Sequence, residues 1–116
     1  MFRVIIAGSR CFNDYEYLKK CMDFYLKNQK DVVVLCGEAH GADTLGKRYA
    51  QERGFSVLSF PADWRRFGRA AGPVRNRAMS AQADACVVFW VGGSPGSASM
   101  VAEARRAGLA LRVRVL

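Results

Sequence analysis

The chain has 116 residues, of which 51% are hydrophobic and 24% are charged, a balance typical of a globular protein. This length supports one domain with its own core and is too short for two, so we predict a single domain over residues 1–116. No apolar run reaches the roughly 20 residues of a membrane-spanning helix, and residues 1–6 enter a strand without the pattern of a signal peptide. We therefore expect a cytoplasmic protein with no membrane partner.

The net charge of +8 is concentrated in the second half of the chain. Residues 64–116 contain nine arginines and only two acidic residues, whereas residues 1–63 are nearly balanced. The planar guanidinium group suits phosphate oxygens, so nucleotides, nucleic acid or an acidic partner are candidate ligands. The alternative is that the arginines bind no ligand and lie on a solvated surface, because a GC-rich genome favours arginine codons.

Metal and hydrolase chemistry are disfavoured by the residues available. The four cysteines form no C-x-x-C pair and His40 is the only histidine, so we predict no metal site. Cys36 and Cys86 lie in apolar runs and are expected to be buried, reduced thiols. No Gly-x-Ser-x-Gly elbow is present, which argues against a serine hydrolase.

The N-terminal part of the chain predicts a strand, a turn and a helix. Residues 2–7 form an apolar run that ends at Gly8-Ser9-Arg10. Asn13 fits a helix N-cap, with Glu16 as its capping-box partner. Apolar residues at helical spacing carry the helix to about Asn28.

The middle of the chain repeats this arrangement. A β-branched strand at residues 32–36 ends in a glycine-flanked turn at 37–43, and a helix is predicted over 41–53. Gly54 is a plausible helix stop. A third strand is predicted at residues 55–60.

Residues 61–72 have no clean period and mix aromatic residues with arginines. Trp64 and Phe67 either stack on a base or cover the sheet edge, and core packing is the commoner fate of such side chains. A helix is predicted over residues 73–82, because proline is favoured at the first helical position.

The last part of the chain predicts a strand at residues 85–91, a glycine-containing turn at 92–97 and a helix at 98–107. A final strand at 109–116 carries alternating arginines, which indicates an exposed edge. Ser97 and Ser99 either cap the helix, or Ser97 donates to a phosphate.

The element order predicts an α/β fold, a Rossmann-like three-layer sandwich with a mostly parallel five-stranded sheet. Right-handed crossovers place every strand-to-helix turn at one edge of such a sheet, and ligands bind there near the point where strand order reverses. The turns at 8–10, 37–43 and 92–97 should therefore converge. Neither a G-x-G-x-x-G nor a Walker A motif is present, and we predict no cofactor.

Two charged positions bear on the predicted ligand. Asp43 lies in the first turn of its helix, where it either interacts with the helix dipole or holds a ribose hydroxyl. Arg75 and Arg77 lie in the first turns of a helix, where the dipole does not favour cations. An anionic ligand is the simplest reason for them.

Four motifs occur in one order along nearly the whole chain: VIIAGSR at residues 4–10, CGEAHGAD at 36–43, PADW at 61–64 and GPVRNRAM at 72–79. Together they resemble the YspA-like branch of the SLOG superfamily, whose Rossmann-like relatives include the Lonely Guy phosphoribohydrolases and the DNA-processing protein DprA. The resemblance implies binding of nucleotides or nucleotide-derived ligands, and relatives often form dimers.

The resemblance assigns roles unevenly. Arg75 with Asn76 and Met79 resembles the Arg-Lys-x-x-Met segment of the phosphoribohydrolases, whose arginine is catalytic. Residues 93–97 resemble their Pro-Gly-Gly-x-Gly-Thr phosphate loop, but the glutamate that follows corresponds here to Ser99 or Met100. Glu103 is the nearest acid, and either it substitutes for that glutamate or it faces solvent. Glu38 and His40 stand where relatives often have glycine and arginine.

Our leading hypothesis is the binding, for sensing or processing, of a nucleotide-derived small molecule. Backbone amides with Arg10, Arg75 and Ser97 would hold phosphate, while Asp43 contacts ribose. The alternatives are hydrolysis of a nucleotide N-glycosidic bond, with Arg75 as the electrostatic group, and single-stranded nucleic-acid binding. The predicted ligand-binding residues are Gly8, Ser9, Arg10, Gly37, Gly41, Ala42, Asp43, Trp64, Asn76, Gly93, Ser94, Gly96 and Ser97.

Overall fold

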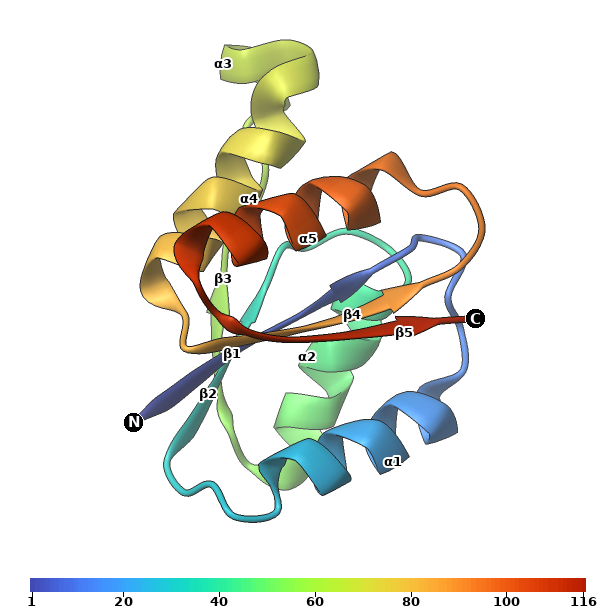
Figure 1. Ribbon diagram of the computed structural model, residues 1–116, viewed down its shortest axis with the longest axis vertical. Coiled ribbons are helices and arrows are strands. Elements are labelled where there is room, and N and C mark those ends of the chain that lie inside the picture. The colour runs from blue at the N-terminus through green and yellow to red at the C-terminus, as the bar shows by residue number, and fades with distance from the viewer.

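A five-stranded sheet forms the middle layer of the computed structural model, which describes residues 1–116 (Figure 1). The strands are β1 (Phe2–Gly8), β2 (Val32–Cys36), β3 (Ser56–Ser59), β4 (Ala85–Trp90) and β5 (Ala110–Val115). Their order is β3-β2-β1-β4-β5, and every neighbouring pair is parallel. The predicted Rossmann-like sheet is confirmed, and it is parallel throughout.

Helices cover both faces of the sheet. The helices are α1 (Tyr15–Leu26), α2 (Ala42–Arg53), α3 (Trp64–Phe67), α4 (Ala71–Gln82) and α5 (Pro95–Ala107). Figure 1 shows α1 and α2 on one side of the sheet and α4 and α5 on the other. The short α3 stands beyond the sheet at one end of the molecule, joined to α4 by a 3-10 turn at Gly68–Ala70.

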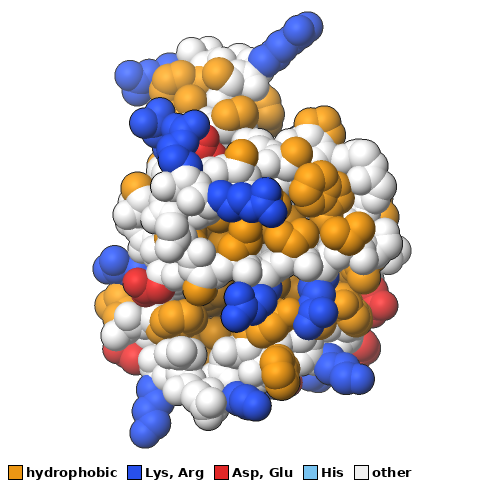
Figure 2. Space-filling model, in the orientation of Figure 1, with side chains coloured by type: hydrophobic (Ala, Val, Ile, Leu, Met, Phe, Trp, Pro, Cys, Tyr) orange, Lys and Arg blue, Asp and Glu red, His pale blue; other side chains and the backbone are white.

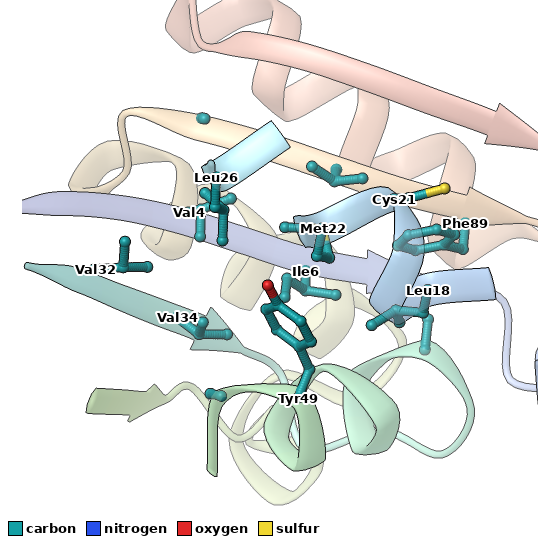
Figure 3. Close-up of a cluster of buried hydrophobic side chains, with 14 of the residues drawn as sticks. Val4, Ile6, Leu18, Cys21, Met22, Leu26, Val32, Val34, Tyr49 and Phe89 are labelled. Carbon is teal, nitrogen blue, oxygen red and sulfur yellow. The ribbon is translucent and has the colours of Figure 1, made fainter. Parts of the chain in front are cut away.

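Alternate residues of β1 supply the cores on the two faces. Val4 and Ile6 belong to the cluster beneath α1 and α2, whereas Ile5 and Ala7 belong to the cluster beneath α4 and α5. Figure 3 shows the first cluster, in which side chains of the strands meet Leu18, Met22 and Tyr49 from the helices. A strand covered on both faces is apolar at every position, which explains the unbroken hydrophobic run at its centre.

The predicted edge strand and buried thiols are also confirmed. β5 lies at one edge of the sheet, with Arg112 and Arg114 exposed. Cys36 and Cys86 are buried and unpaired, and burial raises the pKa of the Cys86 thiol to about 12. No helix has the length and apolar character required to cross a bilayer.

Several predicted helix ends are wrong by one to three residues. Asp14, not Asn13, caps α1, because its carboxylate accepts a hydrogen bond of 3.1 Å from the Tyr17 amide. Helix α1 ends at Leu26, short of the predicted Asn28. Gly54 does stop α2: it adopts φ +70°, and its N–H reaches the carbonyls at the helix end.

The starts of α4 and α5 also differ from the prediction. Helix α5 begins at Pro95 and is capped by Ser94, so neither Ser97 nor Ser99 is the cap. Proline at the first helical position is the signal that predicts this start. Helix α4 begins at Ala71, and Pro73 lies within its first turn, where a missing N–H needs no partner.

Candidate functional site

A cavity of about 580 Å³ opens at the carboxyl edge of the sheet, beside the ends of β1 and β4. The chain leaves these adjacent strands toward opposite faces, so this is the topological switch point at which parallel α/β sheets bind ligands. Ten of the predicted residues line the cavity: Gly8, Ser9, Arg10, Asp43, Trp64, Arg75, Asn76, Gly93, Ser94 and Gly96.

A second cavity of about 340 Å³ adjoins the first. It lies against the turn after β2 and includes the predicted residue Gly37. Both cavities share four lining residues, which are Arg10, Ala39, Trp64 and Arg75. This second cavity was not predicted, because it is lined jointly by the turn after β2 and by Pro61 and Ala62 after β3.

Four predicted site residues line neither cavity: Gly41, Ala42, Ser97 and Glu103. Glu103 instead forms an ion pair of 3.5 Å with Arg106. Gly41 instead holds the turn before α2 against the turn after β1. It adopts φ +78°, and a Cβ there would overlap the carbonyl oxygen of Ser9.

Three serine hydroxyl groups, of which those of Ser9 and Ser97 are buried, tie the turn after β1 to the turn after β4. Ser94 Oγ donates to Ser97 Oγ at 2.8 Å, and Ser9 Oγ donates to the Val91 carbonyl at 3.2 Å. Since the single hydroxyl hydrogen of Ser9 is used in this way, Ser97 is the donor in the 3.2 Å contact between Ser97 and Ser9. The hydroxyl hydrogens of Ser9 and Ser97 are thus committed to bonds within the protein.

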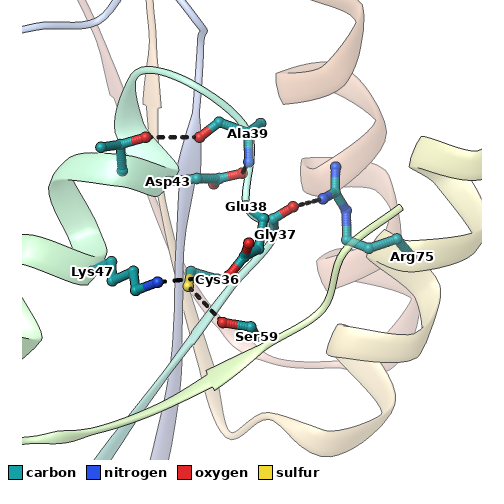
Figure 4. Close-up of polar contacts among 9 residues, drawn as sticks. Cys36, Gly37, Glu38, Ala39, Asp43, Lys47, Ser59 and Arg75 are labelled. Carbon is teal, nitrogen blue, oxygen red and sulfur yellow. Dashed lines mark hydrogen bonds and ion pairs between the residues drawn. The ribbon is translucent and has the colours of Figure 1, made fainter. Parts of the chain in front are cut away.

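The guanidinium of Arg75 lies at the boundary of the two cavities. Its Nη1 donates to the carbonyl of Gly37 (Figure 4). The same Nη1 also donates, at 3.4 Å, to the carbonyl of Phe60, and Nε donates to Asn76 Oδ1 at 2.8 Å. Nη2 has no acceptor within the protein. Arg75 is therefore held firmly by backbone oxygens and keeps one end of its fork free for an anion.

Gly37 is required by this arrangement, because a Cβ at residue 37 would overlap Nη1 of Arg75. The carbonyl contacts also account in part for a cation near the start of α4, for which an anionic ligand is the simplest reason from the sequence alone. Arg77, the other arginine of this argument, is exposed and lines neither cavity.

Asp43 supplies the only carboxylate that lines the larger cavity, and it is just 5% exposed. Its carboxylate accepts a hydrogen bond of 3.1 Å from the Ala39 amide (Figure 4). Burial raises the pKa of Asp43 to about 6, and the charge of Arg75 and the Ala39 hydrogen bond oppose this rise. Burial lowers the pKa of Arg75, and the negative charge of Asp43 opposes this decrease.

Arginines outnumber this carboxylate in the larger cavity. Arg10, Arg69 and Arg75 all line it. Figure 2 shows basic side chains projecting from the end of the molecule at which α3 lies. The field inside the cavity therefore favours an anion.

Trp64 contradicts the expectation of core packing. It is 54% exposed and lines both cavities, and Phe67 on the same short helix is 38% exposed. Asn76 is buried and donates to Ser99 Oγ at 3.1 Å, so it braces α4 against α5. Among the lining residues that sequence reasoning missed, Cys11 and Val91 lie outside the four motifs.

The turn before α5 leaves space that the protein itself does not fill. Gly93 and Gly96 line the larger cavity, and a Cβ at either position would meet no atom within 4 Å. The amino end of a helix also carries the positive end of the helix dipole. An anion can therefore approach this turn closely.

The fold and the cavity together define a Rossmann-like α/β domain with a basic cavity at its switch point. A sequence model of the YspA, cpYpsA-related SLOG family matches residues 2–67. The chain is also 36% identical to the Gene 61 protein of Mycobacterium phage D29, over 94% of this chain and 93% of that protein. The chain belongs to this SLOG family, as its four motifs predicted.

Two solved structures share the fold. The X-ray structure of TM1055 matches with a TM-score of 0.67 and 21% identity, over 96% of this chain and 72% of that one. DNA processing protein A (DprA) from Streptococcus pneumoniae matches with a TM-score of 0.59 and 15% identity, over 97% of this chain and 58% of that one. At these identities the likeness shows a common architecture.

Proposed function

We propose that this protein binds a nucleotide or a nucleotide-derived ligand in the larger cavity. The observation that carries the proposal is the charge of the cavity at the switch point, where three arginines face a single carboxylate. Volumes of this size are typical of small-molecule sites. The DNA-processing function in the name of DprA, which has the same fold, is consistent with a ligand of this class.

The phosphate of the ligand is held by arginine and by the amino end of α5. Arg75 offers its free Nη2, and Arg10 lines the cavity on the side of β1. Gly96 leaves room for an anion at the start of α5. Ser97, by contrast, contributes by fixing the turn, since its hydroxyl hydrogen is directed at Ser9.

The base and the ribose are held by the rest of the wall. The exposed ring of Trp64 offers a stacking surface, and Met79 and Met100 supply apolar contacts. Asp43 is the group that accepts a hydrogen bond from a ribose hydroxyl, which requires its carboxylate to be ionised.

Binding is favoured over N-glycosidic hydrolysis by the position of the carboxylates. Ser99 and Met100, which the resemblance matches to the glutamate of the phosphoribohydrolases, both line the cavity, and the Ser99 hydroxyl accepts from Asn76. Glu103 lies outside both cavities. A hydrolytic mechanism would therefore have to use Asp43, the one carboxylate that the cavity contains.

Thermal-shift measurements with a set of nucleotides test the proposal. We expect at least one nucleoside mono- or diphosphate to raise the melting temperature, and Arg75→Ala to abolish that rise. Arg112→Ala is the matched control, because Arg112 is exposed on β5, far from both cavities. The proposal fails if no nucleotide shifts the melting temperature, or if Arg75→Ala keeps the full shift. Release of free base during the same incubations would instead support the hydrolase.

A second candidate function, single-stranded nucleic-acid binding, is favoured by the exposed surface of α3. Trp64 and Phe67 are exposed there, Arg66 lies over the Phe67 ring at 5.0 Å, and no acidic residue follows until Asp84. Bases stack on such aromatic rings while arginines contact the backbone. Binding of a fluorescent oligonucleotide that weakens steeply with salt, and is lost in Trp64→Ala, would support this function.

A further inference from the structure

The boundary between the two cavities consists of one aromatic side chain, one small residue and two arginines. These residues are Trp64, Ala39, Arg10 and Arg75. An anion held by both arginines therefore lies where the cavities meet, with space on either side of it. A terminal phosphate has a substituent on one side only, whereas a bridging phosphate carries one on each side.

The walls of the two cavities differ in chemistry. Met79 and Met100 line only the larger cavity and, with the shared ring of Trp64, give it apolar faces that suit a base. The smaller cavity is lined instead by Glu38 and His40, whose polar atoms suit hydroxyl groups. The two compartments therefore fit chemically different halves of one ligand.

Glu38 has a free oxygen for such a hydroxyl group. Its Oε1 forms an exposed ion pair of 3.7 Å with Lys47, and Oε2 has no partner in the protein. Glu38 also adopts φ +63°, a backbone conformation that is uncommon for a residue other than glycine. Such conformations persist where the surrounding structure imposes them, and they cluster at ligand sites.

We propose that the ligand is a two-part nucleotide, in which a bridging phosphate at Arg10 and Arg75 connects a nucleoside in the larger cavity to a hydroxyl-bearing group in the smaller one. This inference rests on the proposed nucleotide binding and adds the second group. The bridge is either a diphosphate or a phosphodiester, because the same pair of arginines recognises both.

Calorimetric titration with three probes tests the inference: AMP, ADP-ribose and the dinucleotide pApA. AMP has no group beyond its phosphate and should fill the larger cavity only. ADP-ribose carries a second group joined through a diphosphate, and pApA carries one joined through a phosphodiester. We expect one of the extended probes to bind at least about tenfold more tightly than AMP, a difference of about 1.4 kcal/mol.

A variant that fills the smaller cavity locates the second group. Ala62 lines the smaller cavity and not the larger one, so Ala62→Phe should reduce the affinity for the extended probe to that for AMP and leave AMP binding unchanged. Ala102→Phe is the control, because Ala102 is exposed on α5 and lines neither cavity. The melting temperature without ligand confirms that each variant is folded. Glu38→Gln, which needs no extra volume, should weaken only the extended probe.

Each outcome decides between the alternatives. Tighter binding of ADP-ribose identifies a diphosphate bridge, and tighter binding of pApA identifies a phosphodiester. If AMP binds as tightly as both extended probes, or if Ala62→Phe and Glu38→Gln leave the gain intact, the two-part ligand is excluded while nucleotide binding stands. If none of the three probes binds and no nucleotide of the thermal-shift set raises the melting temperature, nucleotide binding itself is excluded.

Discussion

The turn before α2 and the turn that leads into the first residues of α5 both contain glycines at the carboxyl edge of the sheet, but the glycines are there for different reasons. Side chains at Gly37 and Gly41 would overlap Arg75 and the turn after β1. Side chains at Gly93 and Gly96 would meet only open space in the cavity. The first turn is thus shaped by packing within the protein, and the second leaves room for something outside it.

We expect the largest change in stability from a substitution in the turn before α2. Gly41→Ala places a Cβ against the Ser9 carbonyl in a conformation, φ +78° and ψ −125°, that only glycine adopts readily. We expect a loss of about 3 kcal/mol in the free energy of unfolding, measured by urea denaturation. A loss of less than about 1 kcal/mol would show that the packing of this turn is not as tight as described.

The buried charge of the first turn has a pH signature. The pKa of Asp43 is about 6 in the folded state, above the value of about 3.9 expected when the chain is unfolded. The folded state therefore binds more protons between these values, and stability falls as pH rises from about 4 to 6. Above this window the ionised, buried carboxylate lowers the free energy of unfolding by up to about 3 kcal/mol, and Asp43→Asn removes that loss.

Urea denaturation of the wild type and Asp43→Asn at several pH values measures that difference directly. We expect the stability of the variant relative to the wild type to rise between about pH 4 and 6 and to level off above. A difference that stays constant across this window would show that the pKa of Asp43 is not raised by burial.

The second turn is tested by filling its open space. Gly96→Leu projects a side chain into the larger cavity, and we expect it to weaken nucleotide binding at least about tenfold, or about 1.4 kcal/mol. Ala98→Leu is the matched control, because Ala98 is exposed two residues further along α5 and lines neither cavity. If both variants bind the nucleotide with equal affinity, this turn is not part of the ligand site.

We expect the smallest effect from Gly96→Ala, which should raise the free energy of unfolding, whereas Gly41→Ala lowers it. Gly96→Ala adds only a methyl group, meets no atom and lies within α5. Because alanine favours the helix and restricts the unfolded chain, we expect a gain of about 0.5 kcal/mol in the free energy of unfolding. Thermal unfolding of the variant beside Gly41→Ala gives the sharpest contrast between the turns. A clear loss of stability would mean that Gly96, too, serves the fold.

The architecture could be predicted from the sequence, because the signals that specify it are local. Unbroken apolar runs such as residues 85–90 indicate strands covered on both faces. Gly54 marks a helix end, and the arginines of β5 mark an edge. With right-handed crossovers these signals also bring Gly8, Asp43 and Gly93 to one cavity, as predicted.

Only the tertiary structure decided what each of these residues does there. Whether Ser97 is free or bonded depends on Ser9, which is 88 positions away in the chain. Arg75 on α4 is held by the carbonyl of Gly37, which follows β2. The second cavity needs the ends of β2 and β3 side by side. Contacts of this kind join distant segments, and no local pattern encodes their geometry. The sequence therefore predicted which turns meet at the cavity, but not which of the lining residues are held by bonds within the protein.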